Sequence, residues 1–237
     1  MGHNRYFWAG ICVVLFLGAQ LFQEIALRFW IAAPRTSSEE LLTYLNSTDK
    51  ARALLVMGGI VVLLVPYIVL ALRYFSAQPV LSVLGLLFSV SFVGFEVAHR
   101  SLDFFVLGGM WARQLQSATD GSAREMILNR FAVWNEGVQG LYFPLLMAHL
   151  LASCTFFAMT ASEWKLGGRF RLASAAFVLN AVRLLGRLLS MYGGWAWLNP
   201  LNDRLYFPAV LVINGLLAAW FFFLAWKGDD KNTSALI

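Results

Sequence analysis

Six long apolar stretches, separated by short polar segments, run through the 237-residue chain. Each is longer than the about 20 residues that an α-helix needs to cross the hydrocarbon core of a bilayer. The breaks carry turn residues, such as Pro79 at a helix start and the pairs Gly167-Gly168 and Gly193-Gly194. The pattern predicts one all-α domain over 1–237, a polytopic membrane helix bundle with six transmembrane helices at about 6–33, 52–75, 79–103, 126–160, 170–192 and 204–227.

The ends of the first and third spans carry further information. The apolar run that begins at Tyr6 is too long for the core of a cleaved secretory signal, so we expect a retained first span. After it, Thr36 and two serines are followed by Glu39, a pattern that predicts the cap of a short surface helix. The stretch 104–111 is still apolar, so it predicts either a longer, tilted third span or an interfacial segment.

Composition places the chain in a membrane. Hydrophobic residues make up 59% of it and charged residues only 13%, about half of the charged share in a soluble domain. The net charge of +5 does not indicate nucleic-acid binding, because the basic residues lie at helix ends and form no stripe. Their concentration in short loops on one side predicts that both termini are cytoplasmic, N-in and C-in, and we expect a bacterial cytoplasmic (inner) membrane as the location.

The segment 95–103 places ionisable side chains inside an apolar span. At 100° per residue, Glu96, His99, Arg100 and Asp103 fall within about 100° of one helical face. A charged group near the bilayer centre costs at least about 2.5–3.5 kcal/mol on insertion scales, so such a cluster predicts a functional site.

Other polar residues fall at a similar depth in their spans, in the halves that the predicted topology places toward the extracytoplasmic side. With the segment above, they form the candidate ligand-binding set: Glu24, Glu96, His99, Arg100, Asp103, Asn135, Glu136, Gln139, Asn180, Arg183, Arg187 and Asn214. Carboxylates buried in lipid need partners, and arginine offers a planar, permanently charged one. The set therefore predicts a charge-balanced polar cavity in the extracytoplasmic half. Polar pairs that merely hold helices together are the alternative interpretation.

The same residues bear on catalysis and on metals. A buried carboxylic acid near aromatic walls is suited to proton transfer, which makes Glu96, Glu136 and His99 the candidate acid/base residues. Glu96-x-x-His99 has the spacing by which di-metal helix bundles present ligands, but those sites use two copies of the motif. Because a second copy is missing and arginines lie nearby, we expect no metal and no cofactor.

The six spans, the polar loop after the first, the Gly94-Phe95-Glu96 segment and the Glu-bearing long fourth span resemble a widespread, uncharacterised family of bacterial six-span integral membrane proteins. That resemblance implies the fold and brings no known activity. A fainter similarity links the chain to small integral-membrane terpene cyclases, which also combine intramembrane carboxylates with aromatic walls.

Three hypotheses about function follow. The first is binding or transport of a small amphipathic or anionic molecule, held by Arg183 and Arg187. The second is an intramembrane enzyme that uses buried carboxylates as acid/base on a lipid or isoprenoid. The third is a structural subunit of a membrane complex. The expected partners are the lipid bilayer and the small ligand, no nucleic acid is expected, and membrane-protein partners or homo-oligomers stay open.

Overall fold

The computed structural model describes residues 2–31, 34–166 and 168–227. Of these residues 92% are helical, and no strand occurs among them. The elements in chain order are α1 (Gly2–Ile25), the π-helix η1 (Ala26–Trp30), α2 (Ser37–Thr43), α3 (Ser47–Val62), α4 (Leu64–Tyr74), α5 (Pro79–Leu102), the π-helix η2 (Asp103–Trp111), α6 (Ala112–Ser117), α7 (Gly121–Ala161), the 3-10 turns η3 (Ser162–Leu166) and η4 (Gly168–Phe170), α8 (Arg171–Tyr192), η5 (Ala196–Leu198) and α9 (Asn199–Lys227).

Within these residues, six helical segments are long and apolar enough to span a membrane. The predicted all-α bundle of six spans is therefore confirmed. The structure places the spans at Asn4–Trp30, Ser47–Tyr74, Pro79–Ser117, Gly121–Trp164, Arg171–Tyr192 and Ala196–Trp226.

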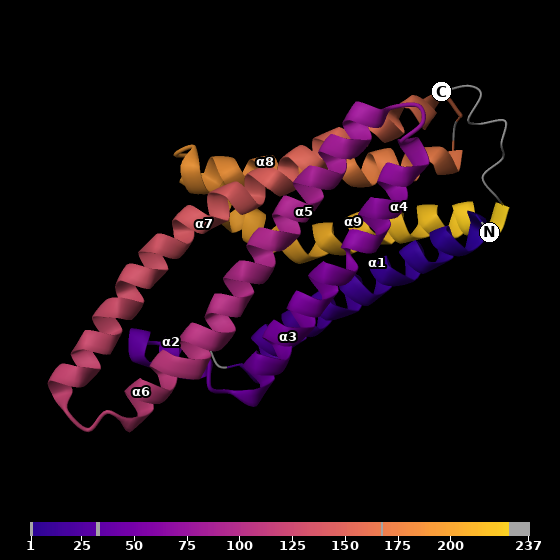
Figure 1. Cartoon of the computed structure of the whole chain (residues 1–237). Coiled ribbons are helices and arrows are strands. Elements are labelled where there is room, and N and C mark those ends of the chain that lie inside the picture. Colours follow the sequence, from indigo (N-terminus) through magenta and orange to yellow (C-terminus); the bar gives the residue numbers. More distant parts are fainter. Residues whose placement is uncertain (1, 32–33, 167, 228–237) are drawn as a thin grey trace.

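The six spans form a closed ring. Each span packs against the next one along the chain, and α9 packs back against α1. The start of α1 and the end of α9 lie at the same end of the bundle, whereas α2 and α6 lie at the opposite end (Figure 1). Because six helices surround one axis, their inward faces enclose space in the middle of the ring.

The third and fourth spans are much longer than the other four. The third runs for 39 residues and α7 for 41, about 60 Å at 1.5 Å per residue, against about 30 Å of hydrocarbon. The stretch 104–111 continues the third span as the helix η2. The excess length of both spans forms a helical arm, which consists of η2, α6 and residues 121–140 of α7 and extends past α1 and α3 (Figure 1).

A small second core packs the arm against α2. Leu107 and Leu115 from η2 and α6 pack with Ile127 and Phe131 of α7 beneath Leu41 of α2. The predicted cap of this short helix is present, since the Thr36 hydroxyl accepts a hydrogen bond from the Glu39 amide at 3.2 Å. The helix α2 thus covers one face of the arm.

Candidate functional site

A cavity of about 540 Å³ lies inside the ring, and all six spans contribute side chains to its wall. Its volume is in the range of sites that hold small molecules. One part of the wall is apolar, with Phe16, Ile60, Leu63, Phe177 and Leu217. The polar part contains six members of the set predicted from the sequence: Glu96, Arg100, Asn180, Arg183, Arg187 and Asn214.

Other members of the predicted set lie elsewhere. Glu24 pairs with Arg28 one turn along the first span and does not line the cavity. His99 and Asp103 lie on a neighbouring face of the third span, behind the cavity wall. Asn135 and Glu136 are exposed on the arm. The side chain of Gln139 lies outside the described residues.

The placement of Asn135 and Glu136 has a simple cause. The sequence pattern predicted that the fourth span enters the bilayer near residue 126, which would put Glu136 about ten residues deep. Because α7 begins at Gly121 and its first part belongs to the arm, Glu136 lies before the helix joins the ring. The first residue of α7 on the cavity wall is Tyr142.

The ionic groups in the cavity are not fully paired. Arg100 Nε lies 3.0 Å from Glu96 Oε1, and Arg187 Nη1 lies 2.9 Å from Asp203 Oδ1 near the exposed end of the wall. Arg183 has no carboxylate within 4.0 Å among the described residues. The predicted charge balance therefore falls short by one, because three arginines face two carboxylates.

Neutral groups hold Arg183 in place. Its Nε and Nη2 donate hydrogen bonds to Asn180 Oδ1 at 3.2 and 3.0 Å, and its guanidinium lies 5.4 Å from the centre of the Tyr206 ring. A cation over an aromatic face is attracted by the ring quadrupole. The arginine is thus positioned without being neutralised.

Asn180 connects Arg183 to the fourth span. Its Nδ2 donates to Ser153 Oγ at 2.8 Å and lies 3.0 Å from His149 Nε2. The His149 ring also stacks on Phe92 at 4.0 Å between centroids. His149 thus hydrogen-bonds within the bundle, and these contacts fix the positions of the Asn180 amide and the Arg183 guanidinium.

Several cavity residues were absent from the predicted set, among them Asn202, Asp203 and Tyr206 at the start of α9. The prediction began the sixth span at 204, whereas the helix begins at Asn199. A usable signal exists in the sequence, since 202, 206, 210, 214 and 217 follow helical spacing and all line the cavity.

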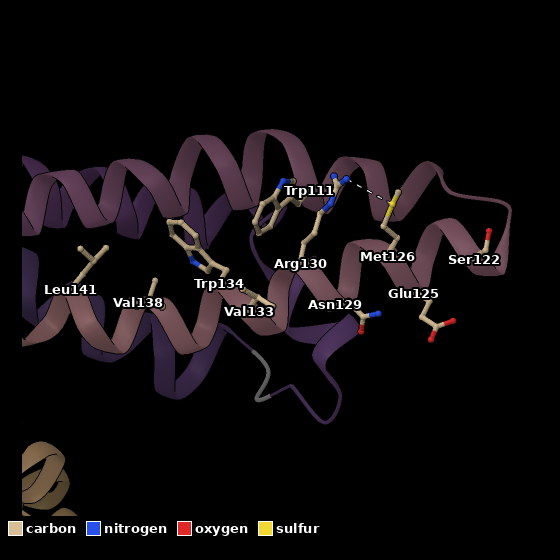
Figure 2. A pocket seen from close by; sticks show the side chains of 11 residues that line it. Trp111, Ser122, Glu125, Met126, Asn129, Arg130, Val133, Trp134, Val138 and Leu141 are labelled. Carbon is tan, nitrogen blue, oxygen red and sulfur yellow. Dashed lines mark hydrogen bonds between the residues drawn. The ribbon is translucent and has the colours of Figure 1, made fainter.

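A second hollow lies outside the ring, on the arm. This open groove of about 890 Å³ runs along α7 beside Trp111, with Val133, Trp134, Val138 and Leu141 as apolar lining (Figure 2). Trp111 and Trp134 meet edge to face at 6.1 Å. Convergent polar groups with a few fixed charges distinguish a ligand site from an apolar surface groove. The cavity inside the ring is therefore the better candidate. Among the described residues, no three His, Cys, Asp or Glu side chains gather in a way that could hold a metal.

The ion pair near the exposed end of the cavity should matter little for stability. Its side chains are 40% exposed for Arg187 and 67% for Asp203. Exposed pairs contribute about 0–1 kcal/mol, because water screens the attraction. We expect Asp203→Asn to change the free energy of unfolding by less than about 1 kcal/mol, measured by unfolding in mixed micelles. A loss of several kcal/mol would mean that the pair is buried.

Comparison of the chain with protein-family models, curated proteins and solved structures gives no match. The resemblance to a bacterial six-span family therefore stays a prediction. The assignment of function depends on the geometry of the cavity.

Proposed function

We propose that this multi-pass membrane protein binds, and moves across or into the membrane, a small amphipathic molecule with an anionic group. The proposal includes the N-in, C-in orientation in a bacterial cytoplasmic membrane, so that the polar part of the cavity lies in the extracytoplasmic half. The observation that carries it is Arg183, a cation on the cavity wall that no carboxylate neutralises within the described residues.

The distribution of polar and apolar lining defines the ligand class. An arginine guanidinium offers a fork of N–H donors that suits carboxylate, phosphate and related oxyanions. The apolar lining from Phe16, Ile60 and Leu217 offers a place for a hydrocarbon part. One unmatched positive charge favours a ligand with a single negative charge over a multiply charged one.

The enzymatic alternative has less support. Of its candidate acids, Glu96 already has the Arg100 guanidinium at 3.0 Å, and Glu136 is exposed on the arm, away from the cavity. The structural-subunit alternative does not explain why Arg183, a cation without a carboxylate partner among the described residues, lines the cavity. A charged group inside a membrane bundle is expensive, so a protein that needs only packing gains nothing from Arg183.

Arg183→Gln tests the proposal. The full chain is placed in phosphatidylcholine nanodiscs, and the affinity for dodecane sulfonate is measured by calorimetry against empty nanodiscs. We expect wild type to bind the sulfonate, and the variant to bind it about 10- to 150-fold more weakly, because a hydrogen bond to a charged group contributes about 1.5–3 kcal/mol.

Arg28→Gln is the matched control, since Arg28 pairs with Glu24 outside the cavity. It should keep the wild-type affinity. Dodecanol, which lacks the charge, should bind wild type and Arg183→Gln about equally. The proposal fails if wild type does not bind the sulfonate, or if both arginine variants bind it as wild type does.

A further inference from the structure

The side chains of segment 96–103 divide between two hollows. Arg100 lines the central cavity and also a small hollow at the outer side of α3 and η2, which Tyr44, Asp49, Arg52 and Asp103 share. Its Nε is 3.0 Å from Glu96 Oε1, and its Nη1 is 4.0 Å from Asp103 Oδ2. The Arg100 guanidinium therefore lies near two carboxylates, that of Glu96 in the central cavity and that of Asp103 in the small hollow.

His99 lies beside this arginine, and it makes no hydrogen bond to any other described residue through its side chain. Its Nε2 is 3.9 Å from Asp103 Oδ2, which is too long for a hydrogen bond. Its Nδ1 is buried and has no hydrogen-bond partner among the described residues, and the residue is only 6% exposed. Native structures rarely leave a buried polar atom unpaired, so each such atom needs an explanation.

The ring of His99 touches the cavity wall. It meets Tyr142 of α7 edge to face at 4.9 Å between centroids, and Tyr142 lines the cavity. The imidazole is thus one side chain away from the ligand space, with a carboxylate on its other side.

We propose that His99 is a proton-binding site that couples protonation to occupancy of the cavity by an anion. This inference rests on the proposed function. When His99 takes up a proton from water, a new N–H bond forms and the imidazolium pairs with Asp103. Asp103, which has Arg100 Nη1 at 4.0 Å, then has a second cationic neighbour, and the protein gains one positive charge beside the cavity. One proton is bound as the anion binds and is returned to water when the anion leaves.

The sign of the coupling follows from the charges that surround His99. Its own helix carries Glu96, Arg100 and Asp103, and α7 contributes the phenol of Tyr142. Behind Asp103, α3 contributes the Asp49–Arg52 pair at 2.7 Å and Lys50, which lines the same small hollow. A proton on His99 therefore adds one positive charge beside the cavity and favours an anion there. By linkage, the bound anion favours the protonated imidazole to the same extent.

The phenol of Tyr44 does not compete for this role. Burial, with the carboxylates of Asp103 and Asp49 next in effect, raises the pKa of Tyr44, which keeps the phenol neutral. Histidine is the side chain whose charge ordinarily changes between pH 5 and 8. The test of the coupling therefore covers that interval.

The test measures the affinity for dodecane sulfonate in phosphatidylcholine nanodiscs between pH 8 and pH 5.5, a range in which the sulfonate itself keeps its single charge. We expect wild type to bind at least about 5-fold more tightly at the acid end. Calorimetry in two buffers with different ionisation enthalpies should show uptake of up to one proton per ligand. His99→Gln should abolish both effects, whereas His149→Gln should keep the pH dependence whatever its absolute affinity.

Asp103→Asn is the second variant, in case His99→Gln does not fold. It removes the partner of the imidazolium and should flatten the pH dependence in the same way. A wild-type affinity that does not change with pH overturns the coupling and leaves the proposed function standing, as does a pH dependence that survives in both variants. Absence of sulfonate binding at every pH overturns both.

Discussion

Arg73→Met is expected to lower the free energy of unfolding by about 3–5 kcal/mol, because it leaves the carboxylate of Glu163 buried and unpaired. Arg73 Nη2 and Nε lie 2.7 and 3.2 Å from Glu163 Oε1, and the two side chains are 5% and 0% exposed. The rings of Tyr6, Tyr74 and Trp220 lie 5.6–5.8 Å from the guanidinium carbon. The group joins α1, α4, η3 and α9 at the end of the ring where the chain begins.

The variant is compared with wild type by unfolding in mixed micelles of dodecyl maltoside and dodecyl sulfate. The double variant Arg73→Met/Glu163→Met is the informative control, because replacing a whole buried ion pair by apolar side chains is often neutral or stabilising. We expect it to be clearly more stable than Arg73→Met. If the free energy of unfolding of Arg73→Met lies within about 1 kcal/mol of the wild-type value, the Arg73–Glu163 pair behaves as a solvent-exposed ion pair.

The number and type of the elements could be predicted from the sequence because they depend on local properties. Apolar length gives the spans, and residues such as Pro79 and Thr36 mark helix starts. The arm could not be predicted this way. A stretch such as 104–111 is equally apolar whether it faces lipid or packs against α2, so hydropathy alone does not show where a long helix leaves the bilayer.

In the candidate site, too, the features that depend on one helix could be predicted, and those that depend on how the helices pack could not. Asn180, Arg183 and Arg187 share one face of a single helix, and the helical period was enough to bring them together. Glu136 was misplaced because its depth depended on where α7 joins the ring. The partners of Arg73 depend on a contact over 90 residues of sequence, which no periodicity contains.

The shortage of one carboxylate in the cavity leads to a sharper prediction, Asn180→Asp. The Asn180 Oδ1 that now accepts both hydrogen bonds from Arg183 would become a carboxylate oxygen at about the same place. Arg183 would then have a charged partner at hydrogen-bond distance, and the cavity would lose its unmatched cation. We expect affinity for dodecane sulfonate to fall about 10- to 150-fold, the equivalent of one charge-assisted hydrogen bond of about 1.5–3 kcal/mol.

The variant should fold, because the neighbours of Asn180 can adapt to a second acceptor. Ser153 Oγ, which now donates to the His149 carbonyl at 2.8 Å, can turn its hydroxyl toward the new oxygen, and the imidazole of His149 can carry its proton on Nε2. Unfolding in mixed micelles should therefore show a stability at least equal to that of wild type. A stable Asn180→Asp variant that no longer binds the sulfonate would show loss of binding without loss of structure. The variant Arg183→Gln does not by itself distinguish these two causes.

Asn135→Asp provides the matched control, since it adds the same charge at an exposed position on the arm. It should leave sulfonate binding unchanged, and the uncharged dodecanol should bind all three proteins alike. If Asn180→Asp binds the sulfonate within about twofold of wild type, Arg183 is not the group that holds the anion. If Asn180→Asp binds neither the sulfonate nor dodecanol, the substitution has closed the cavity. Loss of the anion alone would show that the unmatched charge of Arg183 decides which molecules the cavity accepts.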